Sequence, residues 1–146
     1  MAAIVESIEI ARSPDDVFAY LSDLARHGEW QTEIVSVKVE TDGPTRLGSR
    51  ATDTRKVPGG KRAVTYEITE FDPPRRSAFK GIHGPVRPVG KVNVEPVGEG
   101  SSRVTLELDF EGHGIGKLLL PIIRRDARKH VPQDQARLKE RLESGA

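Results

Sequence analysis

The sequence predicts an α+β fold in which one antiparallel sheet of seven strands precedes a long C-terminal helix. Between residues 35 and 111, apolar and polar residues alternate, and turns rich in Gly and Pro interrupt the alternation repeatedly. Such turns join antiparallel neighbours in a meander. Between residues 115 and 143 the apolar residues instead recur at helical spacing, so this segment is expected to form one long amphipathic helix. The 146 residues suffice for one core, and we expect a single domain over residues 1–146.

The first strand is predicted in AIVESIEIA, where Ile4, Glu6, Ile8 and Ile10 alternate with Val5, Ser7 and Glu9, which suits one better-buried face. The segment SPDD then starts a short helix, because Ser13 can cap it and Pro14 fits its first turn. An apolar stripe follows at helical spacing: Val17, Phe18, Leu21 and Leu24.

The second strand is predicted in EIVSVKVE, where Val35, Val37 and Val39 alternate with polar residues. The breaks DGPTRLG, PGG, DPPRR, HGP and GEG divide the rest of the meander. Five further strands are expected at residues 48 to 57, 61 to 71, 76 to 82, 87 to 97 and 101 to 111.

Two prolines lie in the C-terminal helix, Pro121 near its first turn and Pro132 well inside it. A proline removes a backbone donor and crowds the carbonyl four residues earlier, so Pro132 is expected to kink or split the helix near Arg128. The run RRDARKH is interpreted as a solvated helix face. From residue 115 onward, eight Lys or Arg and four Asp or Glu leave a local charge of +4, which would also suit anionic lipid.

The composition excludes several classes of function. The formal net charge is +1, so no broad basic field points to nucleic acid. The absence of cysteine excludes disulfides and thiol nucleophiles, and none of the four histidines has H-x-x-x-H or H-E-x-x-H spacing, so we expect no metal and no cofactor. No apolar run nears the length of about 18 residues that spans a membrane, and no basic region precedes the first apolar residues. We expect a soluble, unprocessed, cytoplasmic protein.

Three stretches are distinctive: IEIARSPDDVFAYLSDLARHGEW, YEITEFDPPRRSAF, and SSRVTLELDFEG before the helix closing in LKERLE. They resemble the START-like, Bet v 1-like (SRPBCC) superfamily, in particular its bacterial polyketide cyclase/dehydrase branch. The resemblance covers nearly the whole chain. It implies the helix-grip fold, in which two short helices follow the first strand and a curved sheet surrounds the C-terminal helix. It also implies an apolar cavity between sheet and helix for lipid-, sterol- or polyketide-like molecules, without implying a particular reaction.

Hairpin register predicts which side chains face that cavity. If Gly59–Gly60 is a two-residue turn, Tyr66 pairs with Asp53, and a four-residue turn DPPR places Phe79 beside Ile68. The predicted ligand-binding residues are Trp30, Asp53, Arg55, Tyr66, Phe79, Leu106, Leu108, Phe110, Leu118 and Ile122.

Asp53, Arg55 and Tyr66 fall among apolar neighbours on this predicted face. They form either an internal ion pair with a tyrosine hydrogen bond, or an anchor for a ligand's carbonyl, hydroxyl or carboxylate. We favour the internal pair, because buried charges are normally paired. Trp30 is expected mainly to pack at the helix–strand junction.

The segment GHGIGK stands where a phosphate-binding loop would stand, but Glu111 and Leu118 occupy the positions of its first glycine and its Ser or Thr. We interpret it as a hinge at the cavity mouth, where PGGK and HGP are also expected. His83 and His113 belong to this mouth, and loop histidines are more often solvated than an acid–base pair.

The sequence therefore favours binding of an apolar small molecule without catalysis. One alternative is a cyclase- or dehydratase-type enzyme acting in the cavity, and another is a protein-interaction domain with a collapsed cavity. We expect no nucleic-acid partner, and at most transient membrane contact.

Overall fold

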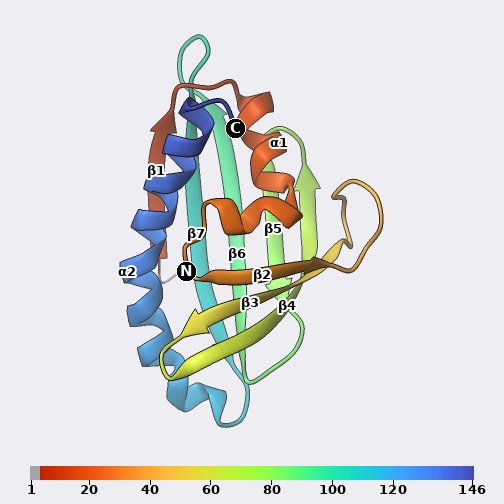
Figure 1. Ribbon diagram of the computed structural model, residues 1–146, viewed down its shortest axis with the longest axis vertical. Helices are drawn as coiled ribbons and strands as arrows, with labels where there is room; N and C mark the ends of the chain where they lie inside the picture. The colour runs from red at the N-terminus through yellow and green to blue at the C-terminus, as the bar shows by residue number, and fades with distance from the viewer. Residues whose placement is uncertain (1–3) are drawn as a thin grey trace.

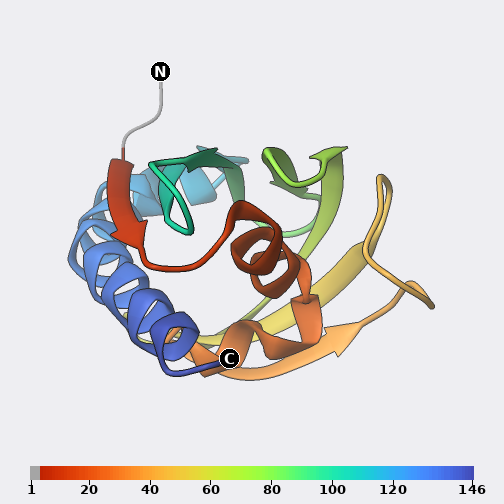
Figure 2. The same ribbon diagram turned by 90° about the horizontal axis from the view of Figure 1, so that it is seen from above.

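The computed structural model describes residues 4–146. Its elements are β1 (Ile4–Ile10), α1 (Pro14–Ser22), the 3-10 helix η1 (Leu24–Glu29), β2 (Ile34–Val39), β3 (Arg50–Val57), β4 (Gly60–Asp72), β5 (Arg76–Gly81), β6 (Val86–Pro96), β7 (Ser102–Gly112) and α2 (Gly116–Glu143) (Figure 1). The strands form one antiparallel sheet in the order β1-β7-β6-β5-β4-β3-β2. The sheet curves around α1, and α2 lies along the side where the curve is open (Figure 2). The predicted helix-grip architecture is confirmed.

The first short helix forms as its sequence predicts. The hydroxyl of Ser13 accepts a hydrogen bond of 3.2 Å from the backbone N–H of Asp16, which satisfies one of the free donors at the helix start. Val17 and Phe18 are then buried in the main core, against Val94 of β6 and other apolar side chains. This packing fixes helix α1 inside the curved sheet.

The hairpin between β3 and β4 differs from the predicted register by two positions. Val57 pairs with Gly60, so the turn residues are Pro58 and Gly59, and Asp53 pairs with Val64. A shift of two keeps every side chain on its predicted face, because successive strand residues alternate between faces. The face prediction is therefore right although the pairing of Tyr66 with Asp53 is wrong.

In the hairpin between β4 and β5, Ile68 pairs with Phe79 as predicted, but two departures from the predicted hairpin compensate each other to produce this pairing. Asp72 pairs with Arg76, so the loop is one residue shorter than expected, and a register shift between Ile68 and Glu70 restores the pairing further along. The residue left out of the ladder is Thr69, which forms a β-bulge.

Helix α2 continues through Pro132, so the predicted split does not occur. Two contacts just after the proline hold the helix in place. The carboxylate of Asp134 accepts a bond of 3.0 Å from the backbone N–H of Thr32, and the amide of Gln135 donates to the carbonyl of Glu6 over 3.1 Å. Pro132 itself is exposed, so the carbonyl that it deprives of a partner lies on the solvated side of the helix. Among the described helices, α2 included, none has the length and apolar character needed to cross a bilayer.

Candidate ligand cavity

A cavity of about 200 Å³ lies between the concave face of the sheet and the helices. Eight of the ten predicted ligand-binding residues line it: Trp30, Asp53, Arg55, Tyr66, Phe79, Leu106, Leu108 and Phe110. The strands supply most of this wall because alternate residues of β3 to β7 point inward. These eight side chains come from five separate segments of the chain: the loop after η1 and strands β3, β4, β5 and β7.

The prediction that Leu118 and Ile122 face this cavity is wrong. Their exposed fractions are 76% and 53%, and α2 instead contributes Ile123, Ala127 and Val131 to the wall. These three residues recur every fourth position and share one helix face, whereas Leu118 and Ile122 lie on a neighbouring face.

The predicted mouth histidines do not line the cavity. His83 and His113 are both exposed, in the loops after β5 and β7. The two loops are packed together, since the backbone N–H of His113 donates to the carbonyl of Pro85 over 2.7 Å. A Cβ atom at Gly116 would lie 1.8 Å from the same carbonyl oxygen, so only glycine fits there. Gly116 of GHGIGK thus serves close packing at the start of α2, and the role of the segment as a hinge stays a prediction.

One wall of the cavity carries a buried ion pair. Asp53 is 4% exposed, its Oδ2 lies 3.4 Å from Nη1 of Arg55, and the same Nη1 donates to Gln31 over 2.8 Å. Burial raises the pKa of Asp53 to about 6, although the neighbouring Arg55 acts in the opposite direction. The internal pair expected from the sequence is therefore present, and Gln31 is a partner that the sequence did not predict.

Four residues that line the cavity each carry one buried polar atom without a hydrogen-bond partner among residues 4–146: Ser22 Oγ, Trp30 Nε1, Asp53 Oδ1 and His130 Nδ1. Of these, Oδ1 of Asp53 can only accept and Nε1 of Trp30 can only donate. Trp30 is only 7% exposed and packs in the main core, as expected, while still reaching the cavity. A buried polar atom without a partner costs free energy, so each is a position where a ligand atom would be stabilising.

Beside them, Tyr66 and His27 form a neutral pair. Nε2 of His27 lies 2.8 Å from the carbonyl of Leu21 and must donate to it, which leaves Nδ1 as an acceptor 3.5 Å from the hydroxyl of Tyr66. Burial lowers the pKa of His27, and burial together with the Asp53 charge raises the pKa of Tyr66. Both groups therefore stay uncharged at neutral pH, and the tyrosine keeps its proton to donate.

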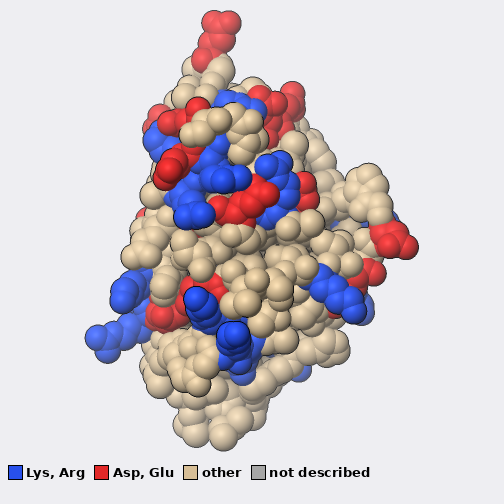
Figure 3. All heavy atoms as spheres, viewed as in Figure 1, with Lys and Arg blue, Asp and Glu red and all other residues tan. Residues whose placement is uncertain are grey.

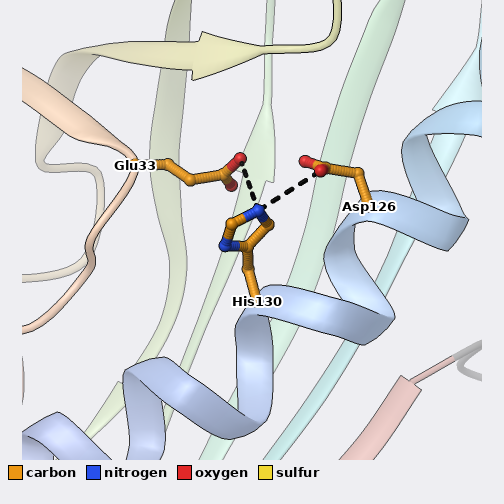
Figure 4. Close-up of side chains that lie close together, drawn as sticks. All are labelled: Glu33, Asp126 and His130. Atoms are coloured by element: carbon orange, nitrogen blue, oxygen red, sulfur yellow. Dashed lines mark ion pairs between the residues drawn. The ribbon is translucent and has the colours of Figure 1, made fainter.

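A third polar cluster on the cavity wall joins the segment before β2 to α2 (Figure 4). Nε2 of His130 lies 3.4 Å from a carboxylate oxygen of Glu33 and 3.3 Å from one of Asp126. Burial and the adjacent Asp126 raise the pKa of Glu33 well above its ordinary value. Sequence reasoning missed this cluster, although Asp126 and His130 stand four residues apart and so share a helix face.

Comparison with known proteins assigns the chain to a family. Residues 1–143 match the family model described as "Polyketide cyclase / dehydrase and lipid transport". The chain belongs to this family. An uncharacterised protein of Mycobacterium tuberculosis is 25% identical to this chain over 140 residues, which cover 91% of this chain and 96% of the relative.

Solved structures support the same fold for this polyketide cyclase/dehydrase family member. TTHA0849 from Thermus thermophilus is 24% identical with a TM-score of 0.80, covering 98% of this chain and 99% of that one. The Zhui aromatase/cyclase from Streptomyces is 14% identical with a TM-score of 0.82, covering 96% of this chain and 92% of that one. At these identities the likeness shows a shared fold only, and it carries no information about a shared reaction.

Proposed function

We propose that this family member binds an apolar small molecule that carries a neutral hydroxyl or carbonyl group. The observation that supports the proposal is an apolar cavity whose wall includes an unpartnered donor, Nε1 of Trp30, and an unpartnered acceptor, Oδ1 of Asp53. A ligand oxygen that accepts from the indole relieves the first, and a ligand hydroxyl that donates to the carboxylate relieves the second.

The charges of the cavity wall favour a neutral ligand over an anion. Four carboxyl groups line the cavity and only two guanidinium groups, those of Arg55 and Arg62, an excess of two carboxyls. Arg55 is already committed to Asp53 and Gln31. A ligand carboxylate would therefore lose its hydration beside carboxyl groups, two of which, Glu33 and Asp53, already have raised pKa values because of burial.

A displacement assay tests this proposal. A neutral solvatochromic dye is bound to the purified protein and displaced with a long-chain alcohol or with the fatty acid of equal length. We expect the alcohol to displace the dye at a concentration at least tenfold lower than the acid at pH 8. Equal potency, or preference for the acid, would contradict the neutral-ligand reasoning.

Variants locate the binding in the cavity. Trp30→Phe keeps the ring but removes the N–H, so it should weaken alcohol binding several-fold and leave binding of the matching alkane unchanged. Tyr20→Phe is a control, because the Tyr20 hydroxyl bonds to Glu29 and does not line the cavity. Native mass spectrometry of the freshly purified protein then identifies any retained ligand. Recovery of a cyclised or dehydrated product from an added precursor would point to the enzyme alternative.

We further propose that the protein contacts anionic membranes transiently through the start of α2. Among residues 4–146, four of the eight exposed large apolar residues lie there: Ile115, Leu118, Leu119 and Ile122, with exposed fractions of 71%, 76%, 37% and 53%. Residues 114 to 125 include three Lys or Arg and no Asp or Glu. Figure 3 shows an uncharged lower end of the molecule with Lys and Arg side chains above it. An apolar surface bordered by basic residues is complementary to an anionic bilayer.

Vesicle sedimentation tests the membrane contact. Vesicles rich in phosphatidylserine should bind the protein more than neutral vesicles, and Leu118→Glu with Ile122→Glu should reduce the bound fraction at least tenfold. Leu47→Glu is the matched control, since Leu47 is 65% exposed in the loop between β2 and β3. A wild-type protein that ignores vesicles but loses self-association in the double variant would show that a second copy covers this surface instead.

A further inference from the structure

Glu33, Asp126 and His130 form a cluster of three metal-ligating side chains. One ligand atom from each can be chosen so that all three atoms lie within 4.8 Å of one another. The three side chains are half-buried, with exposed fractions of 16%, 24% and 25%. They come from two separate parts of the chain, the segment before β2 and the middle of α2, and converge on one point of the cavity wall (Figure 4).

The distances in this cluster are close to those around a bound cation. With metal–ligand bonds of about 2.0–2.2 Å, neighbouring ligand atoms of a tetrahedral or octahedral site lie about 3.0–3.5 Å apart. Nε2 of His130 is already 3.4 Å from Glu33 and 3.3 Å from Asp126. All three ligand atoms lie within 4.8 Å of one another, and a cation between the two carboxylates would draw them closer together.

The electrostatic surroundings of the cluster would also stabilise a bound cation. Within residues 4–146, no Lys or Arg lies within ion-pair distance of Glu33 or Asp126, and both carboxylates share the single His130 nitrogen. Asp134, one helical turn beyond His130, adds another carboxylate to the same cavity. The nearby Arg55 is paired with Asp53, so its charge offsets that of Glu33 only in part and from beyond ion-pair distance.

We propose that Glu33, Asp126 and Nε2 of His130 bind one divalent first-row transition-metal ion. Two carboxylate oxygens and one imidazole nitrogen are a donor set that suits ions from Mn²⁺ to Zn²⁺, and two negative charges match a divalent cation. Three protein ligands leave at least one coordination position open. Because all three residues line the cavity, the open position faces the space where the ligand of the proposed function would lie, so its oxygen is a natural further donor.

The position of His130 on the helix supports this geometry. Asp126 and His130 are four residues apart on one face of α2, so the helix backbone fixes their separation. Glu33 is held opposite them because its carbonyl accepts a bond of 2.8 Å from the backbone N–H of Lys56, and the neighbouring Thr32 bonds to Asp134. The site therefore joins α2 to the sheet, and metal binding should stabilise this junction.

Titration with Co²⁺, followed by its visible absorption, tests the site directly, and calorimetry with Zn²⁺ gives the affinity. We expect one ion per chain, and at least tenfold weaker binding by Asp126→Asn and by His130→Ala. A double variant, Glu111→Gln with His113→Ala, is the matched control, because it removes an exposed carboxylate at the end of β7 and an exposed imidazole from the loop that follows. This control should bind like the wild type.

Thermal unfolding with and without Zn²⁺ gives a second readout that does not depend on ligand binding. The melting temperature of the wild type should rise with Zn²⁺, and that of Asp126→Asn should not. Should either cluster variant fail to fold by circular dichroism, Glu33→Gln takes its place. Wild-type binding no tighter than that of the cluster variants, or an equal loss in the loop control, would overturn the proposal. The dye assay for the apolar ligand, run with chelator present, fails or succeeds independently of this result.

Discussion

Replacing Leu106 with tryptophan is the most direct test of whether the interior holds usable space. Leu106 lies on β7, lines the cavity of about 200 Å³ and packs beside Ala127 and Val131 of α2. At protein packing density, the larger side chain adds roughly 60 Å³, about a third of that space. A cavity accepts this volume with little strain, whereas the same substitution in a packed core lowers the free energy of unfolding by about 1–3 kcal/mol.

Two measurements separate these outcomes. Dye binding should weaken at least tenfold, which corresponds to about 1.4 kcal/mol. For a chain of this size, each kcal/mol of stability shifts the melting temperature by about 3–5 °C, so Leu106→Trp should shift it by less than about 3 °C. Val104→Trp is the matched control, because Val104 faces inward two residues earlier on the same strand but is only 2% exposed in the main core. Val104→Trp should lower the melting temperature by several degrees more than Leu106→Trp does. If Leu106→Trp unfolds the protein as readily as the control does, the interior is a solid core and the cavity proposal fails.

Three further substitutions test other parts of the structure. The folded-state pKa of Asp53, about 6, exceeds its ordinary value of 3.8, so its contribution to stability is full below about pH 4 and is lost as pH rises through 6. Asp53→Asn should therefore gain about 2–3 kcal/mol relative to the wild type between pH 4 and pH 7 in urea unfolding, and a difference independent of pH would refute this. Gly116→Ala should cost about 2 kcal/mol or more in the same assay, because its Cβ would meet the Pro85 carbonyl at 1.8 Å, and unchanged stability would contradict the packing argument. Pro132→Ala should leave the circular dichroism spectrum native and raise stability by about 1–3 kcal/mol, since it restores a backbone donor within α2, and a loss of stability would show that the proline is needed.

The fold was predictable from the sequence because it rests on strand alternation and turn chemistry. The β3–β4 turn lies one residue earlier than predicted, yet Asp53, Arg55 and Tyr66 all keep their inward faces, because the change preserves parity. The bulge at Thr69 was not predictable, since nothing in the local pattern marks which residue leaves the ladder. Strand β2 also departs from simple alternation, because a register shift at Val35 leaves it 46% exposed.

The helix contribution to the cavity was harder to predict. Periodicity shows that α2 has an apolar face, but it does not show where along the helix that face meets the sheet. The sequence therefore predicts Leu118 and Ile122 in the cavity wall, whereas Ile123 lines it. The cluster around His130 was missed because one partner, Glu33, is nearly a hundred residues away in the sequence. The four-residue spacing of Asp126 and His130 was the one local signal of it.

The pairing of β1 with β7 has a consequence for how the chain folds during synthesis. Ser7 and Thr105 lie 98 residues apart in the sequence, yet their hydroxyls meet at 2.8 Å, and β1 has no other strand neighbour. At ribosomal rates of about 5–20 residues per second, the first strand waits roughly 5–20 s for its partner to emerge. The hairpins from β2 to β6 close short loops and are free to form in that interval, whereas β1 must remain unpaired with its isoleucines accessible. We therefore expect β1 to be the strand of the nascent chain that is exposed to aggregation for longest, until β7 has left the ribosome.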